Sequence, residues 1–272
     1  MLLMFSLEII RFPENLYRLY RFRSLLITLV KVEIKLRYRD SIFGILWTVL
    51  NPLINAVVLY FVFRAIFKMR SLDNMDFFPY VYLGILVLNF ITRSIIEGSS
   101  QLHLNASILR KQNVPPEIFI VSKVLGNLLN FYLSIVPLLL YYLIKTYAIN
   151  FNILLLPLIS TVLTLLVSSI SMFLSIFYLS YRDLEHLIPI FLNIVFYISP
   201  VFYTIDMIGG RTETIIKLNP IVYFLDALRF TFNIGGNSHL RFLLISLVIG
   251  MILFILALSY IKYNRKKAIF IS

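Results

Sequence analysis

The stretch SIFGILWTVLNPLINAVVLYFVF, residues 41–63, has no charged residue between Asp40 and Arg64. It is long enough to cross a bilayer core, which takes about 20 apolar residues. Its 14 Leu, Ile, Val and Phe residues favour insertion by about 4–8 kcal/mol, at about −0.3 to −0.6 kcal/mol each. The small costs of Asn51, Pro52 and Asn55 do not reverse that balance. The stretch therefore predicts a membrane-spanning helix.

The rest of the chain continues this pattern. The 272 residues are 60% hydrophobic and 14% charged, against about 45–50% and about 25% in a soluble domain. We therefore predict a single all-α transmembrane domain, residues 1–272, with a cytoplasmic segment 1–40, six spans within 41–261 and a basic cytoplasmic tail 262–272. The predicted spans are 41–63, 77–96, 118–144, 153–180, 187–205 and 242–261.

The second predicted span contains a charge. Arg93 would cost about 2.5–3.5 kcal/mol at a helix centre, whereas the strongly apolar residues of the span supply about 4–7 kcal/mol, so the span still inserts. Glu97 lies four residues later and shares a helical face with Arg93. We expect these two side chains to pair near the interface.

Two other segments are expected to be helical without spanning. Residues 31–40, KVEIKLRYRD, alternate apolar and charged residues as a strand does, but no second strand is visible to pair with them. With residues 17–30 they predict an amphipathic cationic helix on the inner leaflet. Residues 221–234 are apolar but too short to span and contain Asp226 and Arg229. They predict short re-entrant or interfacial helices between spans five and six, with breaks at Gly209-Gly210 and Gly235-Gly236.

The basic residues orient the chain. With both termini in the cytoplasm, 16 of the 25 Lys and Arg face that side, which agrees with the tendency of cytoplasmic loops to be basic. We therefore predict a multi-pass membrane protein with both termini in the cytoplasm.

Several functional classes are disfavoured. The net charge of +12 is scattered rather than gathered, so no nucleic-acid partner is expected. There is no cysteine, the three histidines are isolated, and no catalytic or phosphate-binding motif occurs. We therefore expect no enzyme activity, no metal and no cofactor on this chain. An ATP-driven role would need a separate ATPase subunit.

Three motifs carry a family resemblance. From about residue 24 onward the chain resembles the membrane subunits of ABC transporters that export polysaccharides, including O-antigen and teichoic-acid permeases. The motifs are LRYRDS at 36–41 with Gly44, Trp47, Pro52 and Leu53; Asn105 with Arg110, Lys111 and PPE at 115–117; and YRDL at 181–184 with Pro189, Ser199-Pro200, Asn219-Pro220, Asp226 and Arg229.

The resemblance implies an architecture and a function. It implies a homodimer of six-span subunits joined to two copies of an ABC ATPase subunit that binds ATP and Mg. This assembly would move a lipid-linked, O-antigen-like polysaccharide outward across the cell inner membrane, through a channel between two copies of this chain. Export of a smaller lipid or drug by a related permease remains an alternative. An ion-coupled carrier is less favoured because carboxylates lie only at span ends, and a membrane glycosyltransferase because no acid–base pair is visible.

The resemblance also implies roles for particular residues. Coupling to the ATPase is expected at His103, Asn105, Arg110, Lys111 and Asn113. Channel lining is expected at Trp47 and Asn51 of span one and at Phe191, Tyr197 and Phe202 of span five. The outer gate is expected at Tyr223, Phe224 and Phe230. In addition, the cations Lys35, Arg37 and Arg39 suit the pyrophosphate of an incoming lipid anchor.

Overall fold

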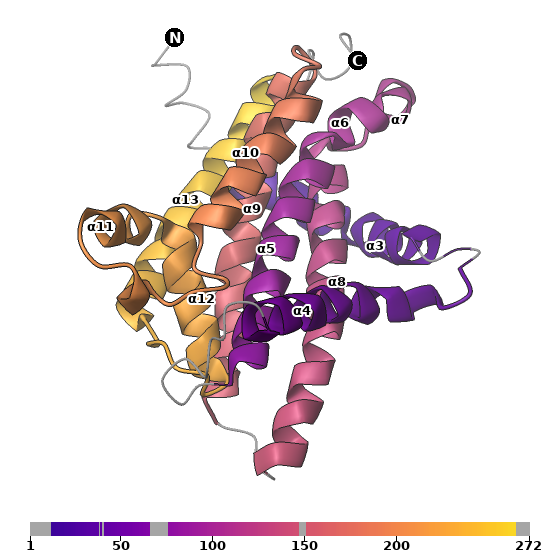
Figure 1. Ribbon diagram of the computed structural model, residues 1–272. Helices are drawn as coiled ribbons and strands as arrows, with labels where there is room; N and C mark the ends of the chain where they lie inside the picture. The colour runs from indigo at the N-terminus through magenta and orange to yellow at the C-terminus, as the bar shows by residue number, and fades with distance from the viewer. Residues whose placement is uncertain (1–11, 38, 40, 66–75, 147–150, 265–272) are drawn as a thin grey trace.

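The computed structural model describes residues 12–37, 39, 41–65, 76–146 and 151–264 (Figure 1). Within these ranges the chain is helical and contains no strand, so residues 31–37 form a helix, as predicted. The elements are α2 (Phe12–Arg21), α3 (Arg23–Arg37), η1 (Gly44–Leu46), α4 (Trp47–Ala65), α5 (Phe77–Ser99), α6 (Gln101–Leu104), α7 (Ala106–Lys111), α8 (Glu117–Thr146), η2 (Phe151–Leu155), α9 (Leu156–Tyr178), α10 (Leu184–Ile198), η3 (Ile205–Met207), α11 (Arg211–Lys217), α12 (Pro220–Thr231) and α13 (Leu240–Tyr263).

Five helices of the described chain are long and apolar enough to cross a membrane. They correspond to α4, α5, α8, α9 and α13 and lie at the positions of predicted spans one, two, three, four and six. The predicted fifth span, 187–205, is wrong at its end, because α10 stops at Ile198 after 15 residues. Pro200 explains the stop. A proline disfavours the helical conformation of the residue before it, and Ser199 is extended, with ψ of 139°.

α5 is the central helix of the bundle. Of an apolar 18-residue stretch within it, 78% is buried, and it packs against α4, α8, α9, α10 and α12. Its backbone approaches α9 closely at Gly98, where an added Cβ would lie 2.8 Å from the Cβ of Ser171. The Ser171 hydroxyl also donates a hydrogen bond to the Ser94 carbonyl oxygen, at 3.1 Å.

α4 differs from the other long helices because it lies across α5 and α8 rather than along them (Figure 1). Its first turn contacts Ser134, which lies past the middle of α8. Near its other end, the ring of Phe63 stacks on that of Phe202 at 5.6 Å and meets that of Phe77 at 6.0 Å. Of an apolar 18-residue stretch within residues 44–63, only 11% is buried.

A second core cluster gathers at one end of the bundle. It joins Leu102 of α6, Leu109 of α7, Ile176 of α9 and Ile261 of α13, with Phe22 packed against it. The chain preceding α3, the loop between α5 and α8 and the end of α13 therefore share one end, as the predicted topology requires. Part of the predicted tail, residues 265–272, lies outside the described residues.

The segment between α10 and α13 packs more deeply than expected. Leu225, Leu228 and Arg229 of α12 are each only 1% exposed, so α12 is packed into the bundle. This contradicts the interfacial alternative, and the re-entrant one stays a prediction. The buried charge is accommodated because the Arg229 guanidinium lies 3.4 Å from the Tyr80 ring centroid and donates to the Pro200 carbonyl oxygen at 2.6 Å. The predicted breaks are confirmed, since Gly210, Gly235 and Gly236 lie between helices and have positive φ.

Candidate functional site

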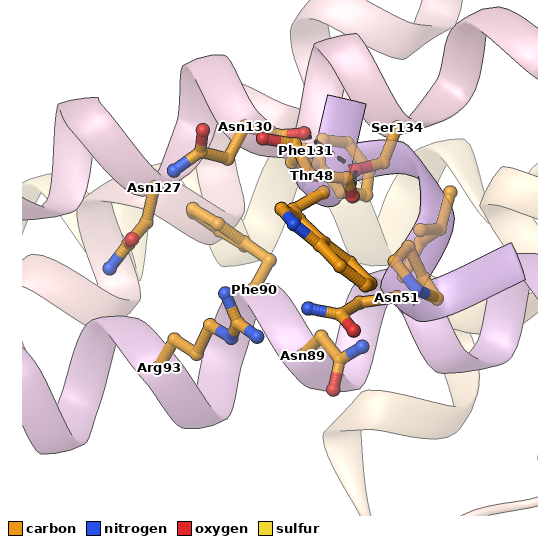
Figure 2. Close-up of a pocket in the computed structure, with 12 residues that line it drawn as sticks. Thr48, Asn51, Asn89, Phe90, Arg93, Asn127, Asn130, Phe131 and Ser134 are labelled. Carbon is orange, nitrogen blue, oxygen red and sulfur yellow. Dashed lines mark hydrogen bonds between the residues drawn. The ribbon is translucent and has the colours of Figure 1, made fainter. Parts of the chain in front are cut away.

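Polar side chains from three apolar helices converge on one pocket. α4 contributes Thr48 and Asn51, α5 contributes Asn89 and Arg93, and α8 contributes Asn127, Asn130 and Ser134. Within each helix these residues are three or four positions apart, which places them on one face. Figure 2 shows them arranged around a common space, which is also lined by Trp47, Phe90 and Phe131. The empty volume is about 410 Å³, part of it open to the surroundings.

A proline helps to build this pocket. Because Pro52 has no backbone N–H, it leaves the carbonyl of Thr48, four residues earlier, without its helical donor. The Ser134 hydroxyl lies 2.9 Å from that oxygen and 2.8 Å from the Asn130 carbonyl oxygen, and can donate to either. The carbonyl released by Pro52 thus attaches α4 to α8 at the pocket wall.

The charge in the pocket belongs to Arg93. Its side chain is exposed, and none of the ion pairs among the described residues includes it. The expected pairing of Arg93 with Glu97 is wrong. Glu97 instead turns to α3 and α8, where Arg37 and Lys123 approach it. The other polar lining groups of the pocket are neutral amides and hydroxyls.

Beside the pocket lies an ionic cluster made of Glu33, Arg37, Glu97 and Lys123. The Arg37 Nη2 atom donates to Glu97 at 2.8 Å and to Glu33 at 3.2 Å. The Lys123 Nζ atom lies 2.5 Å from Glu33 and 3.6 Å from Glu97. Two cations and two carboxylates neutralise each other, and the cluster fastens α3 to α5 and α8.

Asn127 belongs to both features. Its amide oxygen accepts from Arg37 Nη2 at 2.9 Å, and its amide nitrogen donates to Glu97 at 3.1 Å. Its side chain is only 3% exposed and also lines the pocket. One asparagine therefore separates a neutralised cluster from an unneutralised arginine.

The charges of the cluster alter the titration of Glu33. Burial alone would raise its pKa, but the hydrogen bond and charge of Lys123, together with those of Arg37, outweigh burial and lower the pKa below its usual value. Glu33 is therefore held as a carboxylate.

The three cations expected to receive a lipid pyrophosphate have different surroundings. Lys35 and Arg39 are exposed, whereas the Arg37 side chain is 15% exposed and bound by the cluster. The pyrophosphate role stays a prediction, and at Arg37 it would compete with two carboxylates.

The residues expected to couple to an ATPase lie on α6, α7 and the adjoining turns. This end of the bundle also contains the C-terminal end of α13. His103, Arg110, Lys111 and Asn113 are exposed. Asn105 is half-buried, and its amide nitrogen donates to the Gln101 carbonyl oxygen at 3.0 Å. The neighbouring apolar side chains of Leu104 and Ile108 are 66% and 40% exposed. The structure thus brings these residues together on one surface, and their role remains a prediction.

The structure does not gather the expected channel residues in one place. Trp47 and Asn51 line the polar pocket. On α10, Phe191 and Tyr197 are 65% and 73% exposed, and Phe191 borders an apolar groove between α5, α9, α10 and α12. Phe202 follows the end of α10, so it does not continue the helical face of Phe191.

The expected outer-gate residues lie on α12. Phe224 is 2% exposed, Phe230 is half-buried, and the Tyr223 ring stacks on that of Phe242 at 4.6 Å. A gating role for these three is untested and stays a prediction.

Sequence reasoning missed most of the polar pocket. It named Trp47 and Asn51 but not Asn89, Asn127 or Asn130. The available signal was the spacing of Asn127, Asn130 and Ser134, which repeats at three and four residues within an apolar helix.

The comparisons with known proteins agree on one family. An O-antigen export system permease protein RfbA of Klebsiella pneumoniae is 27% identical over 254 residues, covering 92% of this chain and 95% of the relative. RfbA of Myxococcus xanthus is 29% identical over 216 residues, 79% of this chain and 82% of the relative. The polysialic acid transport protein KpsM of Escherichia coli is 23% identical over 231 residues, 82% and 89%. Residues 24–233 match the family described as ABC-2 type transporter. The chain therefore belongs to the ABC-2 type transporter membrane family.

Proposed function

We propose that this chain is the permease subunit of an ATP-driven exporter that moves a lipid-linked polysaccharide outward across the inner membrane. The similarity to O-antigen export permeases along almost the whole chain carries the proposal. The polar pocket supports it, because amides that can both donate and accept hydrogen bonds, beside a tryptophan ring, suit the hydroxyls and apolar faces of sugars. In this proposal six crossings place both termini in the cytoplasm, with α10 as the fifth.

The polysaccharide would pass between two copies of the chain. α4 and α10 are apolar, yet only 11% of the apolar stretch within residues 44–63 is buried, and α10 buries only Ile188 and Leu192. Their open faces offer surface for a second copy, including the aromatic side chains of Phe191 and Tyr197. A long polymer also needs a continuous path, which an interface between two subunits can supply.

The energy would come from two copies of a separate ATPase that bind ATP and Mg. The sequence contains no phosphate-binding loop. The exposed apolar and basic side chains of α6 and α7, including Leu104, Ile108 and Arg110, form a surface of the mixed character found at protein interfaces.

Co-purification and substrate accumulation test this function. An affinity-tagged chain should bring down an ATP-hydrolysing subunit in equal numbers, and a deletion strain should accumulate lipid-linked polysaccharide inside the cell. Accumulation of only a small lipid, or nucleotide hydrolysis by the chain alone, would contradict the proposal.

Cysteine cross-linking tests the path between two copies. The chain has no cysteine, so Tyr197→Cys introduces a single reactive position on α10. This variant should form a disulfide-linked dimer in membranes. Leu244→Cys is the matched control, since Leu244 is 55% exposed on α13. Equal cross-linking of the two variants would contradict a dimer interface at α10.

A further inference from the structure

The pocket between α4, α5 and α8 contains one positive charge without a negative partner among the described residues. The carboxylate nearest in sequence, Glu97, is occupied by Arg37, Lys123 and Asn127. The amides and hydroxyls that line the pocket carry no net charge. The lining thus has a net charge of +1, whereas the adjacent ionic cluster is neutral.

An arginine within a spanning helix is expensive and usually functional. Arg93 lies six residues before the end of α5, which corresponds to about 9 Å at a rise of about 1.5 Å per residue. It is therefore set back from the helix end by almost two turns. A guanidinium presents a planar set of N–H donors that matches phosphate and carboxylate oxygens.

The neutral side chains around Arg93 select for more than a bare anion. Asn51 and Asn89 each offer an amide that can both donate and accept, as sugar hydroxyls require. The Trp47 ring, 38% exposed, provides an apolar face of the kind that packs against a pyranose ring. An oxyanion joined to a saccharide would satisfy the charge and the amides together.

We infer that this pocket binds a saccharide unit that carries an oxyanion, either a phosphate or a carboxylate, with Arg93 holding the oxyanion and Asn51 and Asn89 holding sugar hydroxyls. The inference rests on the proposed function and names the part of the substrate that this site recognises. It places the anion at Arg93 rather than at Arg37, because the two N–H groups of Arg37 Nη2 are already shared among oxygens of Glu33, Glu97 and Asn127.

The pocket contains its own reporter, since Trp47 is the only tryptophan in the chain. The full-length protein in lipid nanodiscs is titrated with glucose 1-phosphate, glucuronate, glucose and inorganic phosphate while Trp47 fluorescence is recorded. Glucose 1-phosphate, glucuronate or both should bind with a saturable change and an affinity about tenfold tighter than that of glucose or phosphate alone. Glucose lacks the charge-assisted hydrogen bonds, which are roughly twice as strong as neutral ones, and inorganic phosphate lacks the sugar hydroxyls. The comparison between the two charged sugars identifies which oxyanion is preferred.

Three variants separate the contributions. Arg93→Gln should weaken binding of the charged sugar about tenfold or more, to the level of glucose, while Arg93→Lys should retain part of the preference because it keeps the charge. Asn89→Ala should weaken charged and neutral sugars alike. Arg182→Gln is the matched control, since Arg182 is exposed outside the spanning helices, and it should bind as the unaltered chain does. Circular dichroism and gel filtration verify that each variant is folded.

Four results would overturn the assignment. They are glucose or inorganic phosphate binding as tightly as the tighter-binding charged sugar, unchanged affinity for that sugar in Arg93→Gln, and no Trp47 response to any of the four compounds. If the ATPase co-purifies and polysaccharide accumulates while no charged sugar binds, the pocket assignment is wrong and the proposed function stands. Binding at Arg93 without an ATPase partner or accumulated polysaccharide would count against the proposed function alone.

Discussion

Asn127 contacts Arg37 and lines the same pocket as Arg93, yet the fold treats the two arginines in opposite ways. Arg37 is 15% exposed and is neutralised by carboxylates from α3 and α5. Arg93 lies in a pocket whose described lining holds no carboxylate. The contrast indicates that Arg37 contributes to the stability of the fold and that Arg93 does not. Breaking a pair in the cluster should therefore destabilise the protein, whereas removing the charge of Arg93 should not.

Loss of Glu97 should have the largest effect. In Glu97→Ala, Arg37 and Lys123 share a single carboxylate, and the free energy of unfolding should fall by roughly 2–3 kcal/mol. This is less than the about 3–5 kcal/mol of a fully buried pair, because Glu97 is 31% exposed. Denaturation of the purified variant in detergent measures the effect, and Glu97→Gln serves as the isosteric control. A loss below about 0.5 kcal/mol would mean that the cluster does not hold α3.

Exchanging a pair of charges sharpens the same point. Glu33→Lys and Lys123→Glu should each destabilise the protein, because each places like charges together. The double variant restores opposite charges across α3 and α8, so it should recover at least about 1 kcal/mol of the summed losses. A double-mutant cycle of unfolding free energies gives this coupling. Strictly additive losses would show that the two side chains act independently.

The hydrogen bond from Ser134 should contribute about 1 kcal/mol. Ser134→Ala removes the donor to the carbonyl that Pro52 leaves open. In a Pro52→Ala background, the restored backbone N–H can bond to Thr48, so the same Ser134 substitution should cost less. The difference between the two backgrounds measures the link between proline and serine. An equal cost in both would assign the Ser134 contribution to its other acceptor, Asn130.

Acidification should remove part of the contribution of Glu33. Its pKa is lower in the folded protein than its ordinary 4.5. The stabilisation is therefore present above pH 4.5 and is lost as the pH falls through the lowered pKa. The melting temperatures of the unaltered chain and of Glu33→Gln should differ above pH 4.5 and should converge as the pH falls through the lowered pKa. A difference that persists unchanged in acid would contradict this role of Glu33.

The smallest effect is expected for Arg93→Gln. Because no carboxylate among the described residues depends on Arg93, its free energy of unfolding should stay within about 0.5 kcal/mol of the unaltered chain. The same denaturation assay as for Glu97→Ala measures it. A loss comparable to that of Glu97→Ala would place Arg93 among the structural charges and remove the contrast between the two arginines.

Local sequence patterns predict most of the helices but fewer of their contacts. Apolar runs with at most one charged residue locate α4, α5, α8, α9 and α13, because insertion depends on the residues of each segment alone. The pairing of Arg93 with Glu97 was plausible from their spacing, yet Arg37 and Lys123 of other helices compete for Glu97. Such competition depends on how α3 and α8 pack, which no local pattern contains.

The pocket and α12 were hidden for the same reason. Each pocket wall is a short polar stripe on its own helix, and only the crossing of α4 over α5 and α8 brings the stripes together. Asp226 and Arg229 argued for an interfacial helix, but the ring of Tyr80 and the carbonyl of Pro200 accommodate Arg229 in the interior. A charged residue can be buried where tertiary contacts stabilise it, and a local sequence pattern does not contain those contacts.

The close approach at Gly98 has a mechanical consequence. Gly98 stands at the last turn of α5, next to α6, and Ser171 of α9 fills the space that a side chain would need. Two helices locked this tightly cannot slide past each other without losing the contact. A displacement of α6 and α7 would therefore move α5 and α9 as one rigid unit, and Arg93 on α5 would move with them.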